Sequence, residues 1–504
     1  MKNLAEKYHA GQTRQGEGYI PYIVHPRDVA ETLISWGEKE DSPLIEMAWG
    51  HDLLEDTAVT EQEILAVSSE RVLNGIKMLT HAGNVDKAAY LQSVADSGNR
   101  DVLLVKISDR ICNTNDFVIL KGDLYAYNYM HKADCLIPAL EKISDDPVVQ
   151  NALKTWKDLN YTLREKALHD AIRGCLLGGA VGDALGAPIE FLPQRSIEKL
   201  YGTVDDYVEY TDGTGRITDD TQMTLFTAEG ILRAHVRGKE RGICSPESIV
   251  KFAYLRWLET QRITPDAPED FINSGWLIKE KDLFVTRAPG STCISALIRG
   301  KQRAENNSKG CGTVMRMAPV GLFFDPVAAY EYGCKFSAIT HGHPTGITAG
   351  GAFAMLISYL RKGTPLKRSL ELVQAHLRKY PEAAETLAAL EHAETAENIT
   401  ELGEGWVAEE ALAIAVFCVL RHQWDFKAGI IEAINITGDS DSTGSIAGNI
   451  LGLLNGEKAI PEKWLSNLRE HRIVSQVSDD LFRRFESNSE GHVSEDWWNK
   501  YPGF

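Results

Sequence analysis

The sequence predicts an all-α protein of two helical domains, a smaller one followed by a larger one. In the first 165 residues apolar side chains recur at helical spacing, as in Val29, Leu33 and Trp36, and few strand patterns interrupt them. Farther along, apolar helical segments rich in small residues recur, notably residues 346–360 and 409–420. A chain of 504 residues is long enough to bury a separate core in each domain.

The composition is that of an ordinary globular protein, 43% hydrophobic and 25% charged, with a formal net charge of −18. Neutralising nucleic-acid phosphates takes clustered Lys and Arg, so this charge argues against an extended nucleic-acid surface. Anionic small ligands remain compatible with it through bound metal ions and local arginines.

No signal-peptide pattern opens the chain, and the longest fully apolar run, residues 411–420, is too short to cross a bilayer. We therefore expect a cytoplasmic protein with no membrane partner. The eight cysteines are scattered without Cys-x-x-Cys spacing, which disfavours a disulfide framework and a zinc ribbon.

Histidines and acids of metal-binding type gather in the first domain. If residues 49–55 are helical, His51 and Glu55 share one face, with Asp52 beside them. Together with His25 and Asp109 they would offer two imidazoles and two carboxylates to one Mn²⁺-like ion, while a neighbouring acid steers the attacking water. A single His-Asp pair, taken alone, is more often an ordinary surface pair.

Three segments of this domain, residues 9–14, 22–26 and 51–57, resemble the His-Asp-domain (HD-domain) hydrolases of the RelA/SpoT kind, especially the small alarmone hydrolases. The resemblance implies an HD-domain helical bundle that cleaves the 3′-pyrophosphate of a purine nucleotide alarmone such as ppGpp or ppApp with one Mn²⁺. It assigns metal binding to His25, His51, Asp52 and Asp109, water handling to Glu55 and Asp56, and nucleotide contacts to Arg14 and Asn113.

Two positions depart from that family pattern. The family often has Lys after the arginine, where this chain has Gln15, and an aromatic residue before the asparagine, where it has Cys112. The departures bear on the grip on phosphate and on base preference, and leave guanine, adenine or NADPH open as the ligand.

A helix break is expected at residues 145–147, followed by a polar amphipathic helix over residues 148–166 that closes the first domain. We place the domains at residues 1–165 and 166–504. No Gly/Ser-rich or Pro-rich linker separates them, so a short and fairly stiff connection is expected.

The second domain carries two clusters in which aspartates alternate with hydroxyls, residues 218–221 and 439–443. Carboxylates and hydroxyls are the hard oxygen donors that Mg²⁺ and Mn²⁺ prefer, and two such clusters can hold a pair of ions. One cluster alone would as readily be a helix N-cap. The run of small residues at 444–448 predicts a tightly packed helix.

Both clusters, with four further segments, resemble the ADP-ribosylglycohydrolases of the dinitrogenase reductase-activating type. The further segments are residues 173–190, 315–319, 340–344 and 405–412. The resemblance implies an all-α domain that removes ADP-ribose from a modified protein or small molecule with a dinuclear Mg²⁺ or Mn²⁺ centre.

By the same resemblance Glu190 and Asp441 act in catalysis, Gly310 and Gly312 approach the pyrophosphate, and His341 lines the substrate cleft. The family commonly has Asn where this chain has Cys311. The implied metal ligands are Thr218, Asp219, Asp220, Asp439, Asp441 and Ser442.

The leading hypothesis is a bifunctional hydrolase that removes pyrophosphate or phosphate from a nucleotide and ADP-ribose from an acceptor. An alternative is a regulatory protein in which one domain binds its nucleotide without turnover. A third reading has the second domain acting on ADP-ribosyl metabolites or nucleic-acid ends. The aromatic residues at 497–501 are expected to cap a domain seam.

Overall fold

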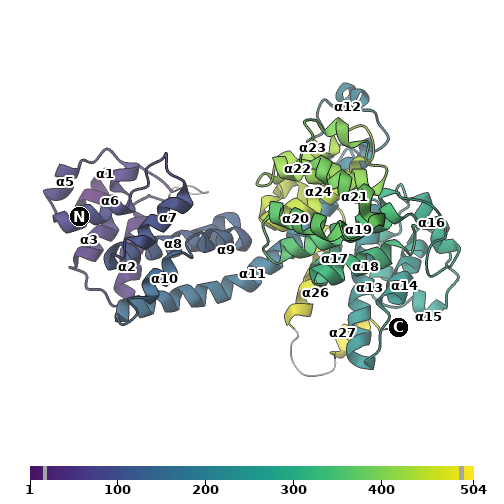
Figure 1. The fold of residues 1–504 in the computed structure, drawn as a ribbon, viewed down its shortest axis with the longest axis horizontal. Helices are drawn as coiled ribbons and strands as arrows, with labels where there is room; N and C mark the ends of the chain where they lie inside the picture. Colours follow the sequence, from purple (N-terminus) through teal and green to yellow (C-terminus); the bar gives the residue numbers. More distant parts are fainter. Residues whose placement is uncertain (15–19, 487–492, 504) are drawn as a thin grey trace. The chain divides into compact units, whose positions relative to one another are not determined.

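The computed structural model describes residues 1–14, 20–486 and 493–503, and these fold into helices without a β-strand (Figure 1). The described β-type contacts are isolated bridges, such as Gly215 with Leu468 and Gly310 with Val407. The predicted all-α class is therefore confirmed. The chain divides into two compact units, Met1–Ala167 and Leu168–Phe504. Gln15, one of the two departures in the first domain, lies outside the described residues.

The first unit is a helical bundle whose core is formed by α2, α3, α6, α8 and the start of α11. Side-chain caps begin several of its helices, as where Ser42 accepts from the amide of Ile45 and where Thr60 and Glu63 form a capping box. Its helices are α1 (Lys2–Tyr8), α2 (Val24–Ser35), α3 (Pro43–Gly50), α4 (Leu53–Asp56), α5 (Glu61–Leu65), α6 (Glu70–Leu79), α7 (Lys87–Asp96), α8 (Arg100–Lys121), α9 (Asp123–His131), α10 (Leu136–Glu141) and α11 (Pro147–Gly186).

The helix is interrupted between α3 and α4, so the prediction of one continuous helix over residues 49–55 is wrong. His51 and Asp52 form a turn between the two helices. Gly50 is the last residue of α3. A side chain would not fit at this position, because an added Cβ would lie 2.7 Å from Cδ1 of Ile76. The imidazole of His51 then bonds back to the carbonyl of Ala48 through Nδ1 at 2.7 Å.

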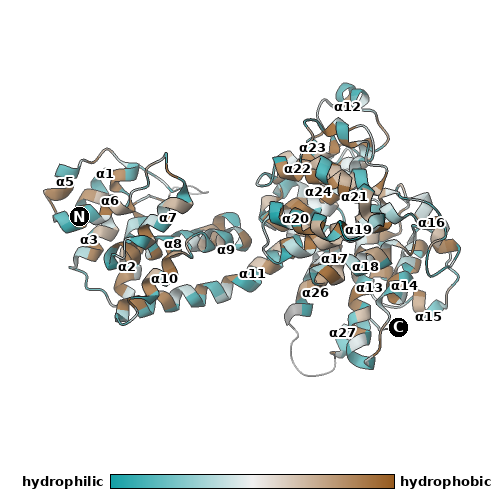
Figure 2. Ribbon diagram, in the orientation of Figure 1, coloured by the Kyte–Doolittle hydropathy of each residue, from teal (hydrophilic) through white to brown (hydrophobic). Residues whose placement is uncertain are grey.

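Helix α11 begins where the sequence predicts but does not end near residue 166. Asp146 accepts from the amide of Val148 at 2.8 Å, and Pro147 opens the helix, as is usual for the first helical position. No Gly or Pro follows until Gly174, so nothing local stops the helix at the expected end. In Figure 2 hydrophobic and hydrophilic residues alternate along its first half, as expected of a helix with one buried face.

Within the described residues no single helix has both the length and the apolar character needed to cross a membrane. The bent pair formed by residues 147–189 and 194–201 passes that test only when its two parts are taken together. The apolar part of this pair, residues 171–186, is largely buried in the second unit.

The second unit packs its helices around long buried ones, with α13 against α14 and α17, α19 against α18, and α24 against α22 and α23. After α11 come η1 (Ala187–Ile189), α12 (Gln194–Tyr201), α13 (Asp219–Arg241), α14 (Pro246–Thr260), α15 (Glu269–Ile272), η2 (Leu277–Lys279), η3 (Lys281–Leu283), α16 (Ser291–Ile298), η4 (Cys311–Thr313), α17 (Ala318–Phe323), α18 (Pro326–Ser337), α19 (Pro344–Arg361), α20 (Leu366–Leu377), η5 (Pro381–Ala383), α21 (Ala384–Ala393), η6 (Ile399–Leu402), α22 (Ala408–Arg421), α23 (Phe426–Ile434), α24 (Ser440–Asn455), η7 (Glu457–Ala459), α25 (Glu462–Asn467), α26 (His471–Glu486) and α27 (Glu495–Lys500).

The aromatic C-terminal segment packs within the second unit. Tyr501 is fully buried and donates to Asp480 at 2.6 Å, and Lys500 lies over the ring of Trp276 at 5.0 Å. These contacts are made inside the second unit, and the cap of a domain seam stays a prediction. A buried carboxylate on α26, which the sequence does not reveal, is what fixes Tyr501 there.

Helices α11 and α24 meet backbone to backbone along a row of glycines on each. A Cβ on Gly182 would lie 2.0 Å from the carbonyl oxygen of Gly444, and one on Gly178 would lie 2.4 Å from that of Gly448. Glycines four residues apart share one helix face, so each row forms a flat stripe that lets the other helix approach. The tightly packed helix predicted from residues 444–448 is thereby confirmed.

We expect Gly182→Ala to lower the free energy of unfolding by about 2 kcal/mol or more, because the added methyl forces two backbones apart. Urea denaturation of the full chain measures this. Gly238→Ala on α13 is the matched control, since its Cβ would meet its nearest neighbour, the Cβ of Cys244, at 3.8 Å. Equal stability of the two variants would contradict the close approach.

Candidate functional site

The two aspartate clusters of the second unit stand at the N-termini of two helices. Thr218 caps α13 by accepting from the amide of Asp220 at 3.3 Å, which places Asp219 and Asp220 in the first turn. Asp439 caps α24 by accepting from the amide of Ser442 at 3.3 Å. The positive end of each helix dipole stabilises these carboxylates, so both clusters are helix caps, and the same oxygens stay available as candidate metal ligands.

A further carboxylate, Asp183 on α11, joins the clusters and was not singled out from the sequence. It accepts from the amide of Thr218 at 2.9 Å and from the hydroxyl of Thr221 at 2.5 Å. The sequence feature that could have identified Asp183 is its position inside the segment 173–190, which carries the resemblance to the glycohydrolases. Asp183 holds the first turn of α13 in place from the side of α11.

A cavity of about 500 Å³ opens over these clusters, and we call it the acidic cavity. One carboxylate oxygen each from Glu190, Asp439 and Asp441 lies within 4.8 Å of the others. In the part of the chain that the structure describes, no Lys or Arg side chain lines this cavity. Its acidic lining residues are Glu190, Asp219, Asp220, Asp439 and Asp441.

Burial raises the pKa of each of these carboxyls, and repulsion by neighbouring carboxylates adds to the rise for Glu190, Asp219, Asp220 and Asp439. The pKa of Asp183 rises to about 7 through burial and the charge of Asp441, and that of Glu190 rises to about 10 through burial and the charges of Asp441 and Asp439. The carboxylate of Asp220 also has an oxygen, Oδ2, that is buried without a hydrogen-bond partner among the described residues. Carboxyl groups that are buried with raised pKa values must either be protonated or lie next to a cation. Their oxygen atoms are donors of the kind that Mg²⁺ and Mn²⁺ prefer.

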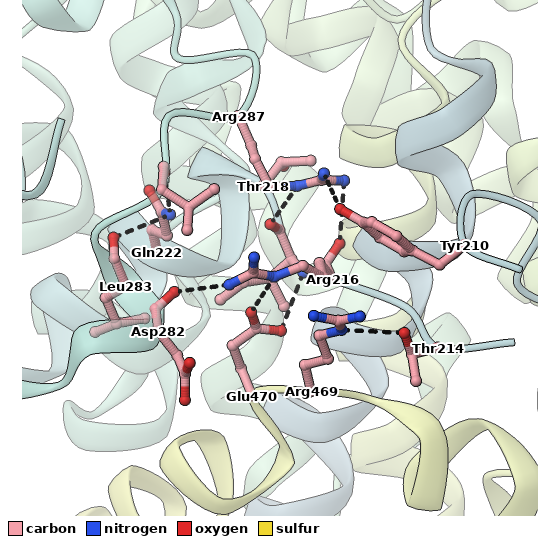
Figure 3. A network of polar contacts seen from close by, with 12 residues as sticks. Tyr210, Thr214, Arg216, Thr218, Gln222, Asp282, Leu283, Arg287, Arg469 and Glu470 are labelled. Atoms are coloured by element: carbon pink, nitrogen blue, oxygen red, sulfur yellow. Dashed lines mark hydrogen bonds and ion pairs between the residues drawn. The ribbon is translucent and has the colours of Figure 1, made fainter. Parts of the chain in front are cut away.

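Arginine contacts fix the peptide that leads into Thr218 (Figure 3). Arg287 donates through Nε to the carbonyl of Ile217 at 3.0 Å, and Arg216 donates to Glu470 at 3.1 Å. The other oxygen of Glu470 accepts from the amide of Ile217 at 3.3 Å. Both side chains therefore hold the residues just before Asp219 in one conformation.

The segment that follows Arg287 wraps around Asp219. The carbonyl of Arg287 accepts from the amide of Asp219 at 3.3 Å, and the amide of Gly290 donates to the Asp219 carboxylate at 3.0 Å. Between them Ala288 has φ of +45°, in the left-handed region that costs a non-glycine residue energy. This strained backbone lines the acidic cavity.

The glycine loop and His341 form another wall of the acidic cavity, where Gly310, Cys311 and Gly312 lie beside His341. Burial and then the charge of Arg316 lower the pKa of His341 to about 3, so its imidazole is neutral at pH 7. The other histidine of this segment, His343, accepts from the amide of Thr345 at 3.1 Å and caps α19.

The structure also brings together the four ligand candidates of the first unit. His25 Nε2 lies 3.1 Å from Asp109 Oδ1 and 3.3 Å from His51 Nε2, and His51 Nε2 lies 3.0 Å from Asp52 Oδ2. Because Nδ1 of His51 contacts the carbonyl of Ala48, its Nε2 points into the cluster, as in many metal-binding histidines. Two imidazoles and two carboxylates converging in this way fit one divalent transition-metal ion.

Two residues that the sequence did not single out support this cluster. Tyr22 OH lies 2.8 Å from both Asp52 Oδ2 and Asp56 Oδ2, and the Lys106 ammonium lies 2.9 Å from Asp109 Oδ2. Burial opposes the ionised form of Asp109, but Lys106 and the hydrogen bond from His25 outweigh it and hold the pKa of that carboxyl well below its usual range. Asp109 is therefore ionised and ready to bind a cation.

A cavity of about 760 Å³, here called the basic cavity, opens beside these ligands and contains Glu55 and Asp56. Arg14 at its wall lies 2.6 Å from Asn113 Oδ1 and 2.7 Å from Asp116 Oδ2. Cys112 does not line it and packs in the core of the unit. Its name refers to the cationic lining residues, Arg14, Lys87, Lys106, Arg110 and Lys132, although acidic side chains line it as well, Asp52, Glu55, Asp56, Asp109 and Asp116. Its aromatic lining residues are Tyr22, Tyr90, Phe117, Tyr125 and Tyr129.

An all-helical unit with carboxylates gathered at helix ends around one cavity is typical of helical proteins that hold metal ions. Residues 164–491 match the family model described as ADP-ribosylglycohydrolase. The chain belongs to this family and is a hydrolase of the ADP-ribosylglycohydrolase type.

Two relatives illustrate the range of similarity over this region. An uncharacterised protein of Archaeoglobus fulgidus is 30% identical over 331 residues, which is 62% of this chain and 97% of the relative. The ADP-ribosylarginine hydrolase Tri1 of Serratia proteamaculans is 25% identical over 348 residues, or 66% of this chain and 85% of the relative.

A separate match of 117 residues links 23% of the chain to 65% of the guanosine-3′,5′-bis(diphosphate) 3′-pyrophosphohydrolase MESH1 of Danio rerio, at 30% identity. This match is too partial to assign a family to the first unit, whose function is therefore a proposal.

In EDTA we expect the free energy of unfolding to fall as pH rises from about 4 to about 7. Folding raises the pKa of Asp183 from 3.8 to about 7, so its stabilising contribution is complete below the unfolded value and is lost on passing the folded one. Chemical denaturation of the second unit at pH 5 and pH 7.5 measures the loss, and saturating Mg²⁺ should reverse it by binding the folded state. Stability in EDTA that rises over this interval would contradict the expectation, and Asp183→Asn should make the fall with pH smaller, because the other raised carboxyls still contribute.

Proposed function

We propose that the second unit hydrolyses the glycosidic bond between ADP-ribose and a modified acceptor. The convergence of Glu190 with Asp439 and Asp441 at the acidic cavity is the observation that carries this proposal. The family match and the relatives that act on ADP-ribosylated substrates support it.

The residues proposed to hold a pair of divalent ions are those at the two helix ends. Bound Mg²⁺ or Mn²⁺ would neutralise carboxylate charge, orient the ribose hydroxyls and make a bound water more acidic. The proposed ligands are Thr218, Asp219, Asp220, Asp439, Asp441 and Ser442, with Asp183 holding the first turn of α13 behind them.

Glu190 is the proposed proton donor. Burial and the neighbouring carboxylates raise its pKa, which favours the protonated carboxyl that a proton donor needs. Hydrolysis adds the hydroxyl of water to the anomeric carbon and a proton to the departing acceptor atom, and Glu190 can supply that proton. The Gly310–Gly312 loop is the proposed partner of the pyrophosphate, since no cationic side chain lines the acidic cavity in the described residues.

Asp441→Asn and Glu190→Gln should each lower release of free ADP-ribose by roughly 100-fold or more, because each removes a charge or a proton that the reaction needs. Release is measured from arginine- and serine-linked substrates with Mg²⁺ and with EDTA. Glu305→Gln, an exposed acid on the same unit, is the control. Full activity of Asp441→Asn, or activity that survives EDTA, would refute the dinuclear assignment.

For the first unit we propose a metal-dependent phosphohydrolase that removes the 3′-pyrophosphate of a purine nucleotide phosphorylated at both ends. The supporting observation is that His25, His51, Asp52 and Asp109 converge beside a cavity lined by five Arg and Lys side chains. A Mn²⁺-like ion held there would lower the pKa of a bound water and polarise the phosphate.

The other roles in the proposed phosphohydrolase reaction are assigned to side chains around the basic cavity. Glu55 accepts from the amide of His81 at 2.9 Å and Asp56 contacts Tyr22, so both carboxylates are held at the wall of the basic cavity. They are proposed to orient the water and take its proton. The basic side chains would neutralise the two phosphate groups. Asn113 donates to Asp109 Oδ1 at 2.5 Å, so Arg14 and Asn113 would contact the nucleotide close to the metal ligands.

Asp109→Ala and Glu55→Gln should each reduce pyrophosphate release from ppGpp or ppApp by roughly 100-fold or more. Products from ppGpp, ppApp, NADPH and plain nucleotides are separated by ion exchange, with the exposed Glu61→Gln as control. Loss of 2′-phosphate from NADPH alone would move the assignment to a phosphatase. Tight binding of ppGpp to the metal-loaded protein without turnover would favour the regulatory alternative.

A further inference from the structure

Arg316 carries a buried charge that no carboxylate contacts within the described residues. Its side chain is fully buried, and Nη2 donates to the Thr340 hydroxyl at 2.6 Å and to the carbonyl of Phe336 at 3.3 Å. Nη1 lies 3.4 Å from the sulfur of Cys293, and the guanidinium carbon lies 4.7 Å from the ring centroid of Tyr254. A charge is costly to bury without a counterion, so these contacts have to explain why an arginine stands here.

The Thr340 hydroxyl links Arg316 to His341. Thr340 Oγ1 lies 2.6 Å from Arg316 Nη2 and 2.8 Å from His341 Nδ1, whereas the carbonyl of Ser337 is farther away, at 3.5 Å. A guanidinium can only donate, so Thr340 accepts from Arg316 and has one proton left to give. The His341 nitrogen is the closer of the two remaining acceptors. Thr340 therefore donates to His341 Nδ1.

This hydrogen bond determines which ring nitrogen of His341 carries the proton. Burial and the charge of Arg316 lower the pKa of the imidazole to about 3, so the ring is neutral at pH 7 and has a single N–H. A nitrogen that accepts from Thr340 has no hydrogen of its own, which leaves the hydrogen on Nε2. His341 is then a neutral hydrogen-bond donor through Nε2.

Nε2 of His341 faces the glycine loop of the acidic cavity. A Cβ added to Gly310 would lie 3.4 Å from this nitrogen, and one added to Gly312 would lie 3.6 Å from it. Glycine at both positions therefore leaves this edge of the imidazole uncovered. All three residues line the cavity, and among the described residues Nε2 has no hydrogen-bond partner.

We propose that Arg316 and Thr340 are positioning residues that hold His341 as a neutral hydrogen-bond donor to an anionic oxygen in the acidic cavity. The inference rests on the proposed glycohydrolase function, which puts the diphosphate of ADP-ribose beside the Gly310–Gly312 loop. A nitrogen that carries hydrogen has no lone pair for a metal ion, and a neutral ring does not repel one. The Nε2–H form therefore binds the anion without competing for the metal ions.

Nitrogen NMR of the full chain tests the tautomer in the absence of substrate. With isotope-labelled histidine at pH 7 and with Mg²⁺, Nε2 of His341 should be protonated and Nδ1 should not, and the signals are assigned by their loss in His341→Gln. Thr340→Val removes the hydroxyl and keeps the shape, so a mixture of both tautomers is expected, whereas Thr340→Ser should restore the wild-type pattern. A wild-type ring protonated at Nδ1, or a Thr340→Val pattern equal to that of the wild type, would overturn the proposal.

Binding and kinetics measure the consequence of losing the donor. Thr340→Val should weaken the affinity for ADP-ribose about fivefold or more, because only part of the molecules then present the Nε2–H. The contact is made alike in bound substrate and transition state, so KM should rise while kcat stays within about twofold. Thr340→Ser should retain the wild-type affinity within about twofold, which separates loss of the hydroxyl from a general loss of structure.

Thr386→Val is the matched control for removing a buried threonine hydroxyl. Thr386 is fully buried in the same unit, its Oγ1 lies 2.8 Å from that of Thr348, and it does not line the acidic cavity. The control should leave both the His341 tautomer and the affinity for ADP-ribose unchanged within about twofold.

Two outcomes distinguish this inference from the glycohydrolase function itself. Thr340→Val that releases ADP-ribose with the wild-type KM would overturn the donor role of His341 and leave the glycohydrolase function intact. Wild-type protein that has the Nε2–H form yet binds no ADP-ribose would overturn the anion assignment together with the glycohydrolase function.

Discussion

The close approach of α11 to α24 is the constraint on which the second unit depends. Carbonyl oxygens of Gly444 and Gly448 occupy the space where side chains at Gly182 and Gly178 would be. This contact brings the end of α11, with Asp183, beside the first turn of α24, and Glu190 follows a few residues later. The geometry of the acidic cavity thus follows from the absence of side chains along two helix faces.

The same contact forces carboxylates together at a cost in free energy that the surrounding groups only partly offset. Helix dipoles, backbone amides and the hydroxyl of Thr221 stabilise individual acids, yet the pKa of each stays raised. Local strain at Ala288 adds to this cost. Such uncompensated charge is common where a protein stores free energy for a ligand that arrives later.

Much of the fold and of the candidate site was predictable from the sequence, and the predictions that failed did so for physical reasons. Helical periodicity gave the fold class, and Asp-Ser-Thr spacing gave the clusters at Asp219 and Asp441, because both signals are local. Asp183 and Tyr22 were missed because their importance lies in contacts with residues more than 25 positions away. The helix expected over residues 49–55 failed because His51 and Asp52 form a turn between α3 and α4, with the His51 imidazole in contact with the carbonyl of Ala48, and residue spacing does not reveal such a turn. The arginine contacts around Ile217 likewise join segments that are distant in the chain.

The lack of basic side chains along the acidic cavity, within the described residues, has a thermodynamic consequence. A pyrophosphate can enter a field of carboxylates only together with cations that screen them. Under the proposed function, metal and ADP-ribose would be reciprocal effectors, each tightening the binding of the other by the same factor. Free divalent metal in the surroundings would set how much substrate the enzyme captures, and accumulated substrate would retain metal in a protein that otherwise releases it.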